Sequence, residues 1–255
     1  MNFHVITLFP GAFDSYLGES IIKRALEDGK IKINFYDPKA FETEGKRADD
    51  KPYGGGPGMV VRVEPVVKAI EAAIKAAGKN KPKIIFLSPG GKQFTNEYAK
   101  SVAKKHQDLI IVSGRYEGLD ERFVEGEVRT ELSLGDYVLS GGELAAAVVI
   151  DTVARLLPGV LGHEDSNVEE SYTAGLLDCP QYTRPEVVDG RSVPEVLLGG
   201  DHAAVRRWRL KQALGRTWLR RPRLLAAREL TAEERELLEE FRDECSTVNS
   251  RREFP

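Results

Sequence analysis

The chain has 255 residues, of which 41% are hydrophobic and 30% charged, a balance that predicts a soluble globular protein and excludes a disordered chain. The net charge is −3, no apolar run approaches the roughly 20 residues that span a bilayer, and residues 1–10 lack a signal-peptide pattern, so we expect no membrane partner and a cytoplasmic location. Two distant cysteines, Cys179 and Cys245, argue against a disulfide framework and a structural zinc site.

The first part of the chain alternates apolar runs with helical patterns. Helices are predicted over residues 14–27, 64–77 and 95–105, and an alanine-rich helix follows Gly142. Strands are predicted over residues 3–8, 31–36, 83–87, 109–112 and 137–139, several of them continuously apolar. Because helices separate the strands, the sequence predicts an α/β fold with a parallel sheet.

Beyond Pro158 and Gly159 the pattern changes. Residues 162–175 are acidic, small and without apolar periodicity, which is typical of a flexible linker. Helical patterns return over residues 202–214, 217–228 and 231–245, and Thr231 with Glu234 forms a predicted capping box. We therefore expect an α/β domain over residues 1–160, a linker over 161–175 and a small helical domain over 176–255.

Three of the predicted strands end in glycine-bearing loops, at residues 87–91 (LSPGG), 112–118 (VSGRYEG) and 138–143 (VLSGGE). Ligands of open parallel sheets bind outside the carboxyl ends of the strands, so the loops could form one pocket. They lack the third glycine of a dinucleotide site and the Lys-Ser or Lys-Thr pair of a triphosphate site, which favours a nucleoside ligand without a phosphate cradle. A single such loop is explained more simply as a tight turn. A fourth cluster, PYGGGPGM at residues 52–59, is interpreted as a flexible lid.

The net charge hides a basic stretch. Residues 206–223 hold eight Lys or Arg, no acid and both tryptophans, Trp208 and Trp218, whereas residues 229–244 are mostly acidic. Arginines beside aromatic planes predict phosphate binding and base stacking on RNA. The alternative, tryptophans in a small helical core, stays open. Tyr182, Thr183 and Arg184 are further candidates for phosphate contacts.

Five stretches in chain order carry a resemblance to a known family: PYGGGPGM, SGRYEG with the following DER, GDYVLSGGEL, LLDCPQYTRPEV and RRWRLKQALGRTWLRRP. Together they resemble the bacterial tRNA (guanine-N1)-methyltransferases of the TrmD family, in the SPOUT class, over nearly the whole chain. The resemblance implies a homodimer whose parallel sheet contains a deep trefoil knot that binds S-adenosylmethionine. It also implies methyl transfer to N1 of the guanine immediately 3′ of the anticodon in tRNA. S-adenosylmethionine has an adenosine and a sulfonium but no phosphate, in agreement with the glycine loops.

The resemblance assigns residues to the cofactor pocket and to the RNA surface. The cofactor-binding residues it implies are Leu87, Ser88, Pro89, Gly114, Tyr116, Glu117, Leu134, Gly135, Asp136, Tyr137, Val138, Leu139, Gly141 and Gly142. The basic stretch and the turn before it supply the candidate RNA-binding residues Tyr182, Arg184, Arg206, Arg207, Trp208, Arg209, Arg220 and Arg221.

Methylation of N1 needs a base that removes its proton and a cation that stabilises negative charge on O6. The resemblance implies Glu170 as the base, where the family has an aspartate, and Arg155 as the cation; Glu169 and Asp165 are alternative bases. Without the resemblance, Arg155 would be interpreted as part of a surface ion pair. Magnesium is implied as well, and Glu117 is its candidate ligand, although the sequence shows no ligand spacing.

Two other functions compete with this one. A non-catalytic RNA-binding protein with a nucleotide-binding-like fold would share the basic stretch but bind no S-adenosylmethionine. A nicotinamide-dependent oxidoreductase would need the third glycine and a ribose-binding acid, which are missing.

Overall fold

The structure is a computed structural model that describes residues 1–42, 47–127, 130–162 and 170–252. The chain divides into two compact units, residues 1–164 and 165–255, and each is described by itself. Within the described ranges, no helix is long and apolar enough to cross a membrane.

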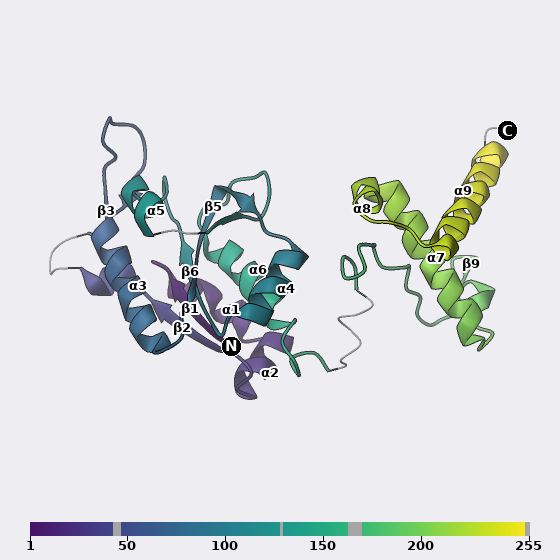
Figure 1. Ribbon diagram of the computed structural model, residues 1–255, viewed down its shortest axis with the longest axis horizontal. Coiled ribbons are helices and arrows are strands. Elements are labelled where there is room, and N and C mark those ends of the chain that lie inside the picture. Colours follow the sequence, from purple (N-terminus) through teal and green to yellow (C-terminus); the bar gives the residue numbers. More distant parts are fainter. Residues whose placement is uncertain (43–46, 128–129, 163–169, 253–255) are drawn as a thin grey trace. The chain divides into compact units, whose positions relative to one another are not determined.

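The first unit is built on a five-stranded parallel sheet (Figure 1). In sheet order its strands are β2 (Lys32–Tyr36), β1 (Asn2–Ile6), β6 (Asp108–Ser113), β5 (Lys83–Gln93) and β7 (Glu131–Ser133). All four neighbouring pairs run parallel, which confirms the predicted α/β class with its parallel sheet. A short antiparallel pair, β3 (Asp49–Asp50) and β4 (Val60–Val61), lies outside this sheet.

Helices cover both faces of the sheet (Figure 1). One face packs against η1 (Pro10–Phe13), α1 (Asp14–Leu17), α2 (Ser20–Glu27), α4 (Asn96–Lys105) and α6 (Glu143–Ala154). The other packs against η2 (Pro38–Phe41), α3 (Val63–Ala77) and α5 (Glu121–Glu127). In β6, Leu109 and Ile111 are buried toward the first group of helices, and Ile110 and Val112 toward the second. A strand buried on both sides needs apolar residues at every position, which explains the continuous apolar runs.

Three predicted elements of the first unit differ from the structure. The strand predicted over residues 83–87 continues to Gln93, so residues 88–91 belong to β5 and not to a loop after it. The strand predicted over residues 137–139 is wrong, because these residues form an exposed loop in which Val138 is 82% exposed; the fifth strand is β7, earlier in the chain. The helix predicted over residues 14–27 is broken after Leu17, where Gly18 ends α1 and Ser20, with a φ of 52°, begins α2. The apolar spacing continues across that break and therefore concealed it.

The second unit contains the predicted C-terminal helices. Its elements are β8 (Val187–Val188), β9 (Arg191–Ser192), η4 (Glu195–Leu197), α7 (His202–Arg220), α8 (Pro222–Ala226) and α9 (Ala232–Arg252). Leu214 and Leu237 are fully buried between α7 and α9. Two helices were predicted where α7 is continuous, because Gly215 lies inside it; a Cβ at this position would collide with the Phe241 ring, so this glycine permits close packing of α9.

The start of α9 confirms the predicted capping box. The Glu234 backbone N–H donates to Thr231 Oγ1 at 3.1 Å, and the Thr231 backbone N–H donates to Glu234 Oε2 at 2.8 Å. Each side chain therefore satisfies a backbone donor that the helix leaves free.

Candidate functional site

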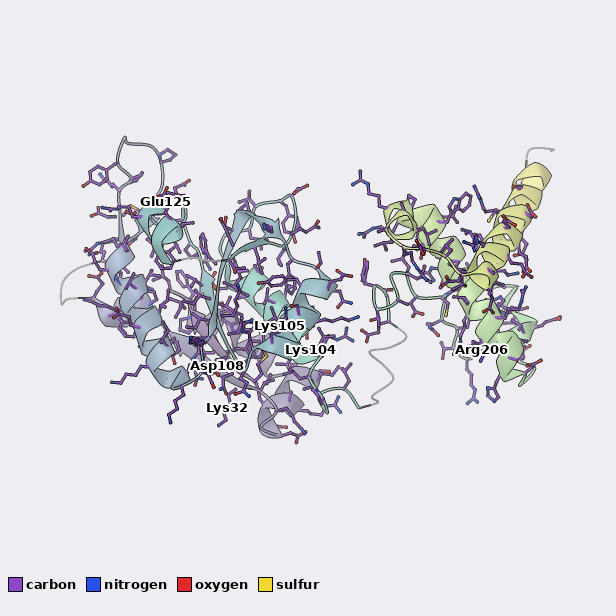
Figure 2. The ribbon with its side chains drawn as sticks, viewed as in Figure 1. Lys32, Lys104, Lys105, Asp108, Glu125 and Arg206 are labelled. Atoms are coloured by element: carbon purple, nitrogen blue, oxygen red, sulfur yellow. The ribbon has the colours of Figure 1, made fainter. Side chains whose placement is uncertain are left out.

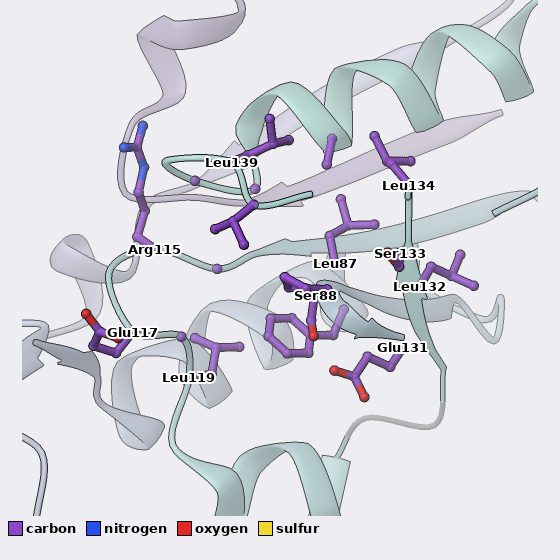
Figure 3. A pocket seen from close by; sticks show the side chains of 18 of the residues that line it. Leu87, Ser88, Arg115, Glu117, Leu119, Glu131, Leu132, Ser133, Leu134 and Leu139 are labelled. Carbon is purple, nitrogen blue, oxygen red and sulfur yellow. The ribbon is translucent and has the colours of Figure 1, made fainter. Parts of the chain in front are cut away.

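A pocket of about 400 Å³ lies at the carboxyl ends of β6 and β7 and beside residues 86–89 in the middle of β5. Its walls come from residues 86–89, 114–119 and 131–142, so all three predicted glycine loops contribute. In Figure 3, Leu134 and Leu139 lie on the side of α6, whereas Glu117 and Glu131 lie on the opposite side. Of the predicted cofactor-binding residues only Asp136 is not part of the lining; those that are comprise Leu87, Ser88, Pro89, Gly114, Tyr116, Glu117, Leu134, Gly135, Tyr137, Val138, Leu139, Gly141 and Gly142.

Glycine allows two of these loops to touch. The Gly142 backbone N–H donates to the Gly114 carbonyl at 2.8 Å. A Cβ on Gly142 would lie 2.8 Å from Ser113 Cα and 2.9 Å from the Gly114 nitrogen, both of which are backbone atoms. A side chain at position 142 would therefore push the end of β6 and the start of α6 apart.

A charged cluster joins the same loops. Arg115 Nε donates to Glu143 Oε2 at 2.9 Å, and its Nη1 donates to the Ser140 carbonyl at 3.1 Å. Glu143, only 4% exposed, also accepts from Thr7 Oγ1 at 2.9 Å. The Arg115 guanidinium lies 4.5 Å from the centre of the Phe9 ring. The sequence prediction missed Arg115 and Glu143, although both stand inside the glycine loops, because it selected those loops for their small residues.

The charges of the lining indicate which ligand fits. Among the lining residues, all of which the structure describes, Arg115 is the single cationic side chain, and its donors are directed to Glu143 and Ser140. Glu117, Glu121 and Glu131 also line the pocket. Such a pocket disfavours a phosphate and suits a neutral or cationic nucleoside. S-adenosylmethionine, with its adenosine and positive sulfonium, fits this description.

The PYGGGPGM loop connects β3 to β4 and is anchored beside the pocket. The Met59 carbonyl accepts from the Glu117 N–H at 3.0 Å, and the Gly118 carbonyl accepts from the Val61 N–H at 3.1 Å. Glycines 54, 55, 56 and 58 have positive φ, and Tyr53 is fully exposed. Its role as a lid stays a prediction.

The two predicted catalytic residues belong to different units. Arg155 follows the last residue of α6, whose first turn borders the pocket; twelve helical residues rise roughly 18 Å, and Arg155 is not part of the pocket lining. It lies near Asp151 and Tyr16, whose hydroxyl pKa is raised by burial and by a hydrogen bond to Asp151. The structure therefore does not bring Arg155 to the pocket of its own chain.

Glu170 lines a cavity of about 510 Å³ within the second unit. The charged and titratable residues that share this cavity are Asp178, Cys179, His202, Arg206 and Arg209. The alternative bases Glu169 and Asp165 lie outside the described residues. Nor do the described ranges contain a group of three His, Cys, Asp or Glu that could hold a metal ion, so the implied magnesium has no site built from them.

The basic stretch presents two different surfaces. Arg207 donates to Glu240 at 2.6 Å and to Glu236 at 3.2 Å, and Lys211 donates to Glu244 at 2.6 Å, so both face α9. Four of the other predicted RNA-binding residues, Tyr182, Arg184, Trp208 and Arg209, line a groove of about 1080 Å³.

The remaining predicted RNA-binding residues lie elsewhere on the second unit. Arg206 borders the Glu170 cavity, and Arg220 and Arg221 are exposed at the end of α7. Trp218 packs against the helical core, with the Arg242 guanidinium 5.0 Å from its ring centre. For this tryptophan the structure supports the core interpretation.

The fold and the pocket define a class of protein: an α/β protein with a pocket suited to a nucleoside-type ligand in its parallel-sheet unit, followed by a helical unit that contains a basic stretch. The family described as tRNA (Guanine-1)-methyltransferase TrmD matches residues 1–227. The chain belongs to this family.

Relatives named tRNA (guanine-N(1)-)-methyltransferase are similar over almost their entire length. The protein from Nitrosococcus oceani is 54% identical over 242 residues, which cover 94% of this chain and 95% of the relative. The one from Coxiella burnetii (strain Dugway 5J108-111) is 53% identical over 244 residues, covering 95% and 98%. The one from Pseudoalteromonas atlantica is 51% identical over 248 residues, covering 97% and 93%.

Proposed function

We propose that this chain transfers a methyl group from S-adenosylmethionine to N1 of the guanine immediately 3′ of the anticodon in tRNA. The observation that carries the proposal is the family match over residues 1–227 together with a pocket lined by glycines and carboxylates at the expected loops. The alternative, a non-catalytic RNA-binding protein with a nucleotide-binding-like fold, does not need a pocket for S-adenosylmethionine.

The residues of the first unit hold the cofactor. Backbone groups of the glycine loops are placed to bind the adenosine, and Leu87, Leu134 and Leu139 exclude water from the pocket. The carboxylates of Glu117 and Glu131 favour a positively charged ligand. When bound, S-adenosylmethionine supplies an electrophilic methyl group on its sulfonium sulfur.

The residues that act on the guanine are Glu170 and Arg155. Glu170 accepts the N1 proton, which leaves the N1 lone pair free to react, and Arg155 stabilises the negative charge that then develops on O6. Glu170 lines a cavity of the helical unit, and a guanine bound in this cavity would lie beside it.

We also propose that residues 131–142 form part of a deep trefoil knot. Support comes from the path of the chain: β7 lies at the edge of the sheet beside β5, yet Gly142 returns to bond with Gly114 at the end of β6. The loop therefore passes across the end of β5 before α6 begins.

We also propose that the chain forms a homodimer. Tyr137 and Val138 in the pocket loop and Leu144 and Val148 on α6 are exposed apolar side chains, Leu144 at 64% and Val148 at 46%. Such a patch is suited to a two-fold interface. In this arrangement, the first unit is the cofactor domain, residues 161–175 link the domains, and the helical unit binds tRNA.

The proposal is tested by tritiated methyl transfer to unmodified tRNA, followed by digestion and identification of the labelled nucleoside. We expect 1-methylguanosine at the position 3′ of the anticodon. Calorimetric titration with S-adenosylmethionine separates the alternative, since a protein that only binds RNA would release no heat. Binding of tRNA without either signal would contradict the proposal.

A further inference from the structure

The groove beside α7 contains two arginines that are not paired with carboxylates of the described residues. Arg207 and Lys211 are paired with glutamates of α9. By contrast, no carboxylate of the described residues lies within salt-bridge distance of Arg184 or Arg209, and both line the groove. Arg184 and Arg209 therefore give the groove two cations available to a polyanion, beside the Glu186 carboxylate that also lines it. Arg206, labelled in Figure 2 on the same helix as Arg209, lies outside the groove.

The floor and walls of the groove are suited to a flat, apolar group. Val193, Leu197, Leu198 and Val205 line it, together with the rings of Tyr182 and Trp208. The two ring centres are 6.3 Å apart and the planes are inclined by 53°, so no base fits between them. Tyr182 is 49% exposed. A base would therefore stack against the outer face of this aromatic pair.

The groove adjoins the cavity of the proposed base. Gln181, Val205 and Arg209 line both the groove and the Glu170 cavity, so the two are neighbours within one unit. If Glu170 removes the proton from N1, the target guanine occupies the cavity. The next nucleotide along the strand is joined to it by one phosphate, and Arg209 stands between the two spaces, where that phosphate would pass.

We propose that this groove binds the unpaired nucleotide next to the target guanine, with its base on Trp208 and Tyr182 and the connecting phosphate on Arg209. The inference rests on the proposed function, because it uses Glu170 to locate the guanine. Besides its arginines and aromatic side chains, the groove is lined by the polar side chains of Gln181, Thr183 and Glu186; the Gln181 amide already donates to Asp178 at 3.2 Å. Stacking on the aromatic pair makes binding at this site dependent on the presence of a base.

The first test uses full-length protein and tRNA that carries 2-aminopurine at the nucleotide on the 5′ side or the 3′ side of the target guanine. Stacking on an aromatic side chain is expected to quench the fluorescence at one of these positions when wild-type protein binds. Trp208→Ala and Tyr182→Ala are expected to lose the quenching, whereas Trp208→Phe, which keeps a ring, retains part of it. An abasic nucleotide at that position is expected to weaken binding roughly tenfold or more, because no base remains to stack on the rings.

The second test compares two charge changes on the same helix. Arg209→Gln is expected to weaken tRNA binding and to lower the slope of log affinity against log salt by about one unit, the contribution of one phosphate contact. Lys211→Gln removes the same charge from a side chain already engaged by glutamates, and we expect an unchanged slope. Equal effects of the two changes would contradict the assignment of the groove.

The outcomes separate this inference from the proposed function. If wild-type protein methylates tRNA but quenches 2-aminopurine at neither position, or if Trp208→Ala quenches as strongly as wild type, the inference is overturned and the function stands. If wild-type protein does not methylate tRNA, the proposed function fails first. If circular dichroism shows that Trp208→Ala is unfolded, the other two variants decide the question. Tyr182→Ala removes a ring and should lose the quenching, whereas Trp208→Phe keeps a ring and should retain part of it.

Discussion

At the scale of single residues, a buried carboxylate lies at the end of the sheet opposite the pocket (Figure 2). Asp108 accepts hydrogen bonds from Asn2 at 2.8 Å and from Asn80 at 2.6 Å, and His4 Nε2 lies 3.2 Å away. The other ring nitrogen of His4 lies 3.0 Å from the Tyr36 hydroxyl. A neutral His4 satisfies this arrangement, since it can donate to Asp108 and accept from Tyr36. The network ties the first strand of the chain to β6 and to the turn after α3.

The network predicts a pH dependence of stability. Burial by itself raises the pKa of Asp108, but the hydrogen bonds from Asn2, His4 and Asn80 outweigh it and hold the pKa below the ordinary value of 3.8. A lowered pKa in the folded state stabilises the protein above the unfolded-state value, and this contribution is lost as the pH falls through the folded-state pKa. We expect Asp108→Asn to cost about 1–3 kcal/mol at neutral pH and to reduce the loss of stability in acid. Urea unfolding between neutral and acid pH measures both effects.

The control for this prediction is Asp189→Asn. Asp189 is paired with Arg191 in an exposed position, where a salt bridge contributes little. Its substitution should leave the free energy of unfolding and its pH dependence unchanged. If Asp108→Asn behaved in the same way as this control, the network would have no role in acid stability.

The proposed base gives a second prediction at this scale. Glu170→Gln keeps the size and hydrogen-bonding shape of the side chain but cannot accept the N1 proton. We expect methyl transfer to fall by roughly 10²- to 10⁴-fold, the usual contribution of a general base, while cofactor and tRNA affinities stay within a few-fold. Single-turnover methylation and separate binding titrations measure the two quantities. Near-normal turnover would exclude Glu170 and direct the same test to Glu169 and Asp165.

At the scale of elements, the contact between the end of β6 and the start of α6 shapes the pocket. Gly142→Ala would place a methyl group 2.8 Å from Ser113 Cα. This distance is too short, so the backbone of β6 or of α6 would have to move. Overpacking of this kind costs about 1–3 kcal/mol, and we expect a loss of S-adenosylmethionine affinity of roughly tenfold or more. Calorimetric titration measures it. Gly126→Ala in α5 is the matched control, because a Cβ there meets nothing within 4 Å and should leave the affinity unchanged.

The elements also show what the sequence could and could not predict. Strands buried on both faces, such as β6, and helices with a regular apolar spacing, such as α3, were identified because their patterns follow directly from their surroundings. Residues 137–139 have the same apolar character as a strand but line the pocket instead, and no local pattern distinguishes the two cases. The three-residue β7 is defined by its pairing with β5, which depends on residues far away in the sequence.

The same limit applies to side chains of the site. The glycine loops were recognisable because their spacing is local, and they do meet at one pocket. Arg115 and Glu143, which are in contact, are 28 residues apart in the sequence, and Glu143 and its partner Thr7 are 136 residues apart. Such a cluster follows from the fold and could not be predicted from either residue alone.

At the scale of the whole molecule, the placement of the two proposed catalytic residues raises the question of which chain completes a site. Arg155 lies at the far end of α6 from the pocket, and Glu170 belongs to the helical unit. The exposed apolar side chains of Tyr137, Val138, Leu144 and Val148 lie in the pocket loop and on α6, where a second copy would cover them. A two-fold interface on this surface would set the pocket of one chain against residues of its partner. We therefore expect the active site to be shared.

Mixing two inactive variants tests the shared site. Arg155→Ala and Glu170→Gln subunits should each be nearly inactive alone, because every site of either homodimer lacks one catalytic group. In a hybrid dimer with shared sites, one site combines the intact Arg155 of one chain with the intact Glu170 of the other, and the second site carries both defects. Random exchange makes about half of the dimers hybrids with half of their sites intact, so we expect recovery of about a quarter of wild-type activity. Differently tagged subunits, purified in succession, establish that hybrids have formed. If verified hybrids showed no methyl transfer above the two parent variants, each chain would have to build its site from its own Arg155 and Glu170.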